Sequence, residues 1–165
     1  MKALVLYDSV FGNTQKVAEA IASALAARAQ VELAKASHQP LPKLADIDLL
    51  VVGSPTRGFR PTEDVAAFLK SIPRKGLAAK SVAAFDTRFK ADEVKSAMTR
   101  FVVKTGGYAA KRIASTLTKA GGALAAPPEG FYVEDIEGPL KAGELNRAAA
   151  WASSLLAPPQ ASLGA

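Results

Sequence analysis

The first 28 residues place a short polar loop between an apolar strand and an amphipathic helix, and this arrangement constrains the fold most strongly. Residues 3–6 are apolar without interruption, which is typical of a strand buried on both faces. Residues 14–28 carry Val17, Ile21 and Leu25 at helical spacing. A strand that passes directly into a helix is the first half of a βαβ unit, so we expect a parallel sheet with helical crossovers.

The same alternation continues along the chain. Strands are predicted at residues 2–7, 31–34, 48–54 and 80–85, followed by a fifth, bent strand over 124–126 and 130–133. Helices are predicted at residues 14–28, 62–72, 91–104, 108–119 and 140–156. Five such strands predict an α/β fold, a three-layer, doubly wound five-stranded parallel sheet. We expect one domain over residues 1–157 and a flexible tail over 158–165.

Composition excludes several kinds of protein. The chain has no cysteine, so any redox role must come from a bound cofactor. No apolar run is long enough for a membrane span, and the short apolar N-terminus ends at Asp8, so we expect a cytoplasmic protein without a signal peptide. The only histidine, His38, has no metal-ligand partners at useful spacing, so no metal site is predicted.

The net charge of +6 has two interpretations. It can serve solubility alone, or it can attract an acidic partner or an anionic ligand. Nucleic acid is not a predicted partner, because the basic residues are scattered and no helix-turn-helix, zinc-finger or stacking-aromatic pattern accompanies them.

Polar loops follow three of the predicted strands, at residues 7–14, 54–62 and 86–90. Ligands of doubly wound sheets bind beyond the carboxyl ends of the strands, so these loops predict a binding site. In the first loop, Ser9, Asn13 and Thr14 offer side-chain donors, and Gly12 allows a tight turn before a helix N-terminus. Such a loop can hold a phosphate, although it is neither a Walker loop nor GxGxxG. The alternative is an ordinary turn in which Asn13 or Thr14 caps the helix.

Residues 8–14 resemble the flavodoxin phosphate loop, whose pattern is Ser/Thr-x-Thr-Gly-Asn-Thr, with Phe11 in place of the middle threonine. The spacing of all three loops matches that family over nearly the whole chain. The resemblance implies a sheet order of 2-1-3-4-5, non-covalent FMN and transfer of one electron at a time. It implies no catalytic residue. The cofactor-binding residues that it implies are Ser9, Val10, Phe11, Gly12, Asn13 and Thr14 at the phosphate, Pro55, Thr56, Arg57, Gly58 and Phe59 along one face of the ring, and Asp86, Thr87, Arg88 and Phe89 near its pyrimidine end.

Three functions are compatible with this resemblance. The first is an electron carrier that exchanges electrons with a redox partner protein. The second is a small FMN-dependent NAD(P)H or quinone reductase. The third is a flavodoxin fold without flavin that acts as an interaction module. A signalling receiver domain is excluded, because it needs a phospho-accepting aspartate where Ser54 ends the third strand.

The basic character of the chain distinguishes it from classical electron-carrier flavodoxins, which are acidic. An acidic redox partner is therefore the partner that the charge suggests. Reduced FMN is anionic, so a guanidinium of Arg57 or Arg88 close to the ring would favour it. We accordingly expect the second one-electron reduction potential to be less negative than in acidic flavodoxins.

Overall fold

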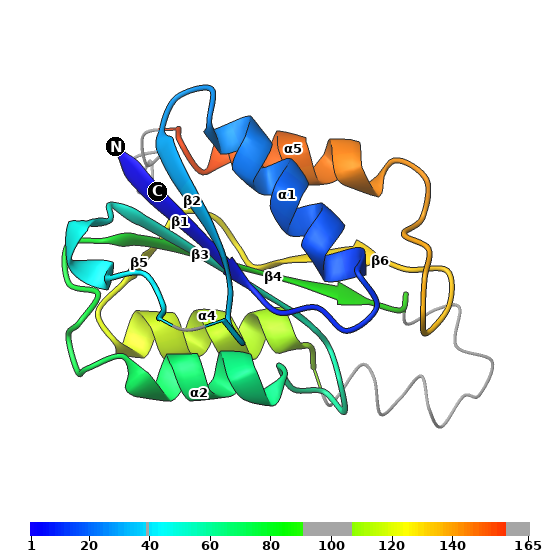
Figure 1. The fold of residues 1–165 in the computed structure, drawn as a ribbon, viewed down its shortest axis with the longest axis horizontal. Coiled ribbons are helices and arrows are strands. Elements are labelled where there is room, and N and C mark those ends of the chain that lie inside the picture. Colours follow the sequence, from blue (N-terminus) through cyan, green and yellow to red (C-terminus); the bar gives the residue numbers. More distant parts are fainter. Residues whose placement is uncertain (39, 91–106, 158–165) are drawn as a thin grey trace, which may run out of the picture.

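The computed structural model describes residues 1–38, 40–90 and 107–157 (Figure 1). Its sheet has the order β2-β1-β3-β4-β5, with every pairing of these strands parallel, and β6 pairs with the end of β4. The predicted fold class and strand order are confirmed. The strands are β1 (Lys2–Tyr7), β2 (Gln30–Lys35), β3 (Leu49–Pro55), β4 (Ser81–Arg88), β5 (Ala123–Leu124) and β6 (Glu129–Tyr132). The helices are α1 (Asn13–Leu25), α2 (Glu63–Ser71), α4 (Ala109–Lys119) and α5 (Glu144–Ser154), with a short 3-10 helix η1 (Leu44–Asp46). The predicted helix over 91–104 and the predicted tail lie outside the described residues.

Helices lie on both faces of the sheet, which gives the three layers (Figure 1). Helices α1 and α5 pack on one face, and α2 and α4 pack on the other. Successive residues of β3 point to opposite faces, so Val51 belongs to the α1–α5 core and Val52 to the α2–α4 core. Both faces are buried, which explains why the central strands are apolar without interruption.

The fifth strand is divided into two short segments. β5 pairs with the start of β4, β6 pairs with its end, and Pro127 and Pro128 lie between the segments. Proline has no N–H to donate to a sheet ladder, so pairing stops there. The predicted bend is therefore a break, and β6 brings the segment that follows it, residues 133–140, to the carboxyl ends of the other strands.

Two kinds of structure are absent from the described part of the chain. No helix in those ranges has the length and apolar character needed to cross a bilayer. Among the same residues, no three His, Cys, Asp or Glu side chains are grouped so that they could hold a metal ion.

Candidate functional site

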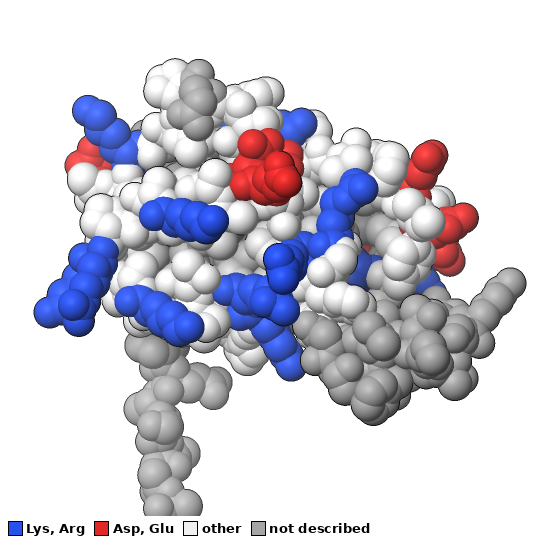
Figure 2. Space-filling model, turned by 90° about the horizontal axis from the view of Figure 1, so that it is seen from below, with Lys and Arg blue, Asp and Glu red and all other residues white. Residues whose placement is uncertain are grey.

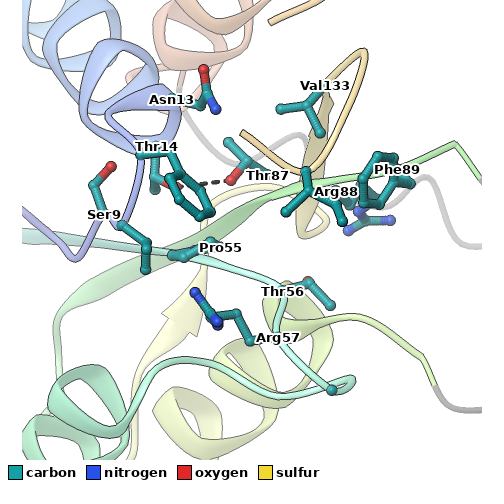
Figure 3. A pocket seen from close by; sticks show the side chains of 14 residues that line it. Ser9, Asn13, Thr14, Pro55, Thr56, Arg57, Thr87, Arg88, Phe89 and Val133 are labelled. Carbon is teal, nitrogen blue, oxygen red and sulfur yellow. Dashed lines mark hydrogen bonds between the residues drawn. The ribbon is translucent and has the colours of Figure 1, made fainter. Parts of the chain in front are cut away.

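A pocket of about 270 Å³ lies at the carboxyl ends of β1, β3 and β4. Its walls come from the three predicted loops and from the segment after β6 (Figure 3). The lining residues are Ser9, Val10, Phe11, Asn13, Thr14, Pro55, Thr56, Arg57, Gly58, Thr87, Arg88, Phe89, Val133 and Ile136. The fold thus brings twelve of the fifteen predicted cofactor-binding residues around one pocket. Gly12, Phe59 and Asp86 are not among the lining residues, and Val133 and Ile136 are additions that the sequence did not suggest.

The loop before α1 is shaped to receive an anion. Gly12 adopts a left-handed conformation (φ 92°), which an L side chain would strain. Its N–H donates to Ser9 Oγ at 3.1 Å, which closes the loop. No side chain caps α1, so neither Asn13 nor Thr14 acts as the cap that the alternative interpretation required. The first-turn N–H groups have no acceptor within the helix, and the helix dipole favours negative charge in front of them.

Two side chains of this loop are fixed by distant parts of the chain. Thr14 Oγ1 and Thr87 Oγ1 share a buried hydrogen bond of 2.8 Å, which joins the start of α1 to the end of β4 (Figure 3). The Asn13 amide donates from Nδ2 to the carbonyl oxygen of Glu137 at 3.1 Å. Both side chains line the pocket, so these contacts hold polar groups in position around it before any ligand is present.

Asp86 is turned into the protein rather than into the pocket. Its carboxylate is fully buried and accepts from Arg88 Nε at 2.5 Å, from Arg88 Nη2 at 2.9 Å, from Ala110 N at 2.8 Å and from Thr56 Oγ1 at 3.1 Å. Burial raises the pKa of Asp86, and the bonds from Arg88 oppose that rise. The Arg88 guanidinium also stacks 3.7 Å from the centre of the Tyr108 ring. Asp86 therefore fixes an arginine of the pocket wall and the start of α4, and its carboxylate does not face the pocket.

The second loop forms a tight turn. Arg57 and Arg60 exchange two backbone hydrogen bonds of 2.9 and 3.0 Å. The two residues between them, Gly58 and Phe59, both have positive φ, 53° and 65°. This two-residue turn places Phe59 at its tip, away from the lining, while Arg57 stays on the pocket wall.

An apolar rim surrounds the opening of the pocket, and Phe59 is not part of it. Val10, Phe11, Phe89 and Ile136 line the pocket and are 48%, 48%, 39% and 68% exposed. They are half of the large hydrophobic residues exposed in the described part of the chain. Their concentration at one opening indicates a surface that an apolar ring or a partner covers. The chemistry of the pocket is thus divided: donors at the Ser9–Asn13–Thr14 side, apolar groups at the rim, and the guanidinium groups of Arg57 and Arg88 along the wall (Figure 3).

Comparison with known proteins agrees with this architecture. The sequence model of the family described as the flavodoxin domain matches residues 4–127. Among solved structures, flavodoxin 1 from Bacillus cereus has a TM-score of 0.75 at 18% identity, with 94% of this chain and 97% of that chain covered. A flavodoxin from the domain Archaea has a TM-score of 0.72 at 20% identity, covering 94% and 96%. Flavodoxin 2 from Bacillus cereus has a TM-score of 0.69 at 24% identity, covering 94% and 97%. No curated protein matches the chain by sequence.

Proposed function

The chain belongs to the flavodoxin domain family, and from that premise we propose that it binds FMN and acts as an electron carrier. The observation that supports this most strongly is the pocket in front of α1. There an uncapped helix N-terminus, the Ser9 and Thr14 hydroxyls and the Asn13 amide lie next to an opening rimmed by apolar side chains. FMN has the matching parts, a phosphate dianion at one end and a flat, largely apolar ring at the other.

The residues present fit FMN at both ends. At the phosphate end, hydrogen bonds to a charged group contribute about 1.5–3 kcal/mol each, so a few donors are sufficient without a lysine or arginine in the loop. At the ring end, Pro55 and Gly58 form one wall and Thr87 and Phe89 another. The chain has no cysteine, so bound FMN would supply the one-electron redox chemistry.

The groups of the chain have separate tasks in this proposal. Ser9, Asn13 and Thr14 bind and orient the phosphate. Phe11 and Phe89 would shield part of the ring from water, and because both side chains are half exposed at the opening, a partner could approach there. Arg57 supplies positive charge close to an anionic reduced cofactor. An open edge is all that a carrier requires, whereas a reductase also has to hold a nicotinamide or a quinone beside the ring.

Titration of the purified chain with FMN tests the proposal. Flavin fluorescence should be quenched with one FMN per chain. The FMN-loaded chain should accept electrons from a chemical reductant and pass them to a one-electron acceptor, with little turnover when NADPH is the only donor. Rapid NAD(P)H oxidation with a quinone would instead establish a reductase. Unchanged FMN fluorescence would show that FMN does not bind. Both redox functions would then be overturned, and the flavin-free interaction module would be the remaining function.

A further inference from the structure

The surface made by α2, α4 and residues 56–62 is strongly basic. We call it the α2–α4 face. Its exposed basic residues are Arg57, Arg60, Lys70, Lys111, Arg112 and Lys119, and its exposed acidic residues are Glu63 and Asp64. Figure 2 shows this side of the molecule, where blue groups are spread over the surface and red ones form one cluster near the centre and further groups towards the edges. The face thus carries an excess of four positive charges, two thirds of the net charge of the whole chain.

Within the described residues, these basic side chains take part in no ion pair. In the ranges that the structure describes, the ion pairs join Arg88 to Asp86 and Arg147 to Glu129 and Glu144. None of the six basic residues of the α2–α4 face takes part in them. A face whose only purpose is solubility commonly intersperses both signs, which lowers its potential. The excess here creates a positive field directed at solvent.

The α2–α4 face is continuous with the opening of the pocket. A groove of about 890 Å³ runs along it, with Arg60, Lys70 and Arg112 in its walls. Val10 and Arg57 line both the groove and the pocket. A molecule seated in the groove would therefore also touch the pocket rim, where it would come close to bound FMN. Electron transfer between two proteins requires that their redox centres come close to each other, and docking in the groove would bring a partner close to the pocket.

We propose that the α2–α4 face docks an acidic redox protein, which exchanges one electron with the cofactor across the shared rim. The inference rests on the proposed function for its electron-transfer step, but the docking itself depends only on the charges and the groove. A partner protein fits better than a nucleic acid. Glu63 and Asp64 line the same groove and would repel a uniform polyanion, whereas a protein can place a basic residue against them. Among the described residues that line the groove, none has an aromatic side chain on which a base could stack.

The probe for the test is an acidic [2Fe–2S] ferredoxin. Its binding to the flavin-free full chain is followed by amide NMR shifts, and stopped-flow absorbance follows its reduced centre giving one electron to oxidised FMN on the loaded chain. The test variant is Lys70→Glu/Arg112→Glu. The matched control, Lys2→Glu/Arg28→Glu, makes the same change in net charge at exposed positions near the amino ends of the strands. As a further control, the reduced FMN-loaded chain is reacted with benzoquinone. Because benzoquinone is uncharged, its rate depends on the flavin and not on the charges of the α2–α4 face.

At low salt, the test variant should lower the association rate constant with ferredoxin about tenfold or more, and the control less than twofold. The difference should disappear near 0.5 M salt, and both variants should react normally with benzoquinone. NMR shifts should be confined to α2, α4 and the rim. Equal effects of the two variants would overturn the inference, as would tighter binding of single-stranded DNA or of phosphatidylserine vesicles to the same face. If no FMN binds but ferredoxin still shifts these residues, the proposed function fails and the docking surface stands.

Discussion

The hydrogen bond between Thr14 and Thr87 permits a test that separates a structural role from a ligand-binding role. The two hydroxyls lie 2.8 Å apart, and both are buried at the pocket wall. Between them they have two protons. In our assignment Thr87 Oγ1 donates to Thr14 Oγ1, so the Thr14 proton is the one that can be donated to a phosphate in the pocket. Thr14→Val removes one hydroxyl and keeps the shape, and Thr14→Val/Thr87→Val removes both.

The two variants should differ in stability. Thr14→Val leaves the Thr87 hydroxyl buried without its partner, which costs about 1–3 kcal/mol of unfolding free energy. Replacing both partners by apolar groups of the same shape is nearly neutral, so the double variant should recover most of this loss. FMN affinity should not recover. The lost hydrogen bond to a dianion is worth about 1.5–3 kcal/mol, which weakens binding roughly 10- to 150-fold in both variants.

Urea unfolding of the flavin-free proteins gives the stabilities, and fluorescence titration gives the FMN dissociation constants. Thr14→Ser, which retains a hydroxyl, should keep wild-type affinity within a few-fold and serves as the control. If the double variant regains affinity together with stability, the two hydroxyls support only the fold, and the assignment of Thr14 to the phosphate is wrong.

Other predictions concern charge, pH and packing. Arg57→Ala should make the second one-electron reduction potential of the bound FMN more negative, as measured by spectroelectrochemistry. A guanidinium about 5 Å from the ring, at an effective dielectric near 20, limits the shift to on the order of 140 mV, and solvent screening reduces it further. An unchanged potential would contradict this role of Arg57. Glu144→Gln should make the free energy of unfolding depend less on pH on the acid side. Burial alone would raise the pKa of Glu144, but hydrogen bonds led by Arg147 lower it overall, so its contribution is present above pH 4.5 and is lost as pH falls further; an unaltered acid limb in urea unfolding would refute it. Gly53→Ala should cost about 1–3 kcal/mol or more, because the added Cβ would lie 2.0 Å from the buried Phe85 ring. Thermal unfolding should show a smaller loss when Gly53→Ala is made in a Phe85→Leu background.

Much of the fold and of the pocket was predictable because buried parallel strands are apolar without interruption and ligands bind beyond their carboxyl ends. Leu49 to Val52 identified β3 directly, and the polar residues after it identified a pocket loop. That the donors of the first loop would line the pocket was predictable for the same reason. Ser9, Asn13 and Thr14 lie within one short stretch of sequence, so the loop that holds them is a local feature.

The remaining features depend on contacts that are distant in sequence or on backbone geometry. The break between β5 and β6 brings Val133 and Ile136 to the pocket, and only the prolines before β6 gave any signal of it. Phe59 is carried to a turn tip by positive φ at two successive residues, which is unusual for a residue other than glycine. Asp86 looked like a ligand-binding residue, but its carboxylate is fully used inside the protein, chiefly by Arg88.

The claim that an anion site in front of α1 anchors the cofactor can be tested by comparing FMN with riboflavin, which lacks the phosphate. Both ligands present the same ring to the rim, so the difference between their dissociation constants reports the loop of Ser9 to Thr14 alone. Two or more charge-assisted hydrogen bonds predict that FMN binds at least about 100-fold more tightly. Equal affinities for FMN and riboflavin, or no binding of either, would contradict the phosphate site at this loop.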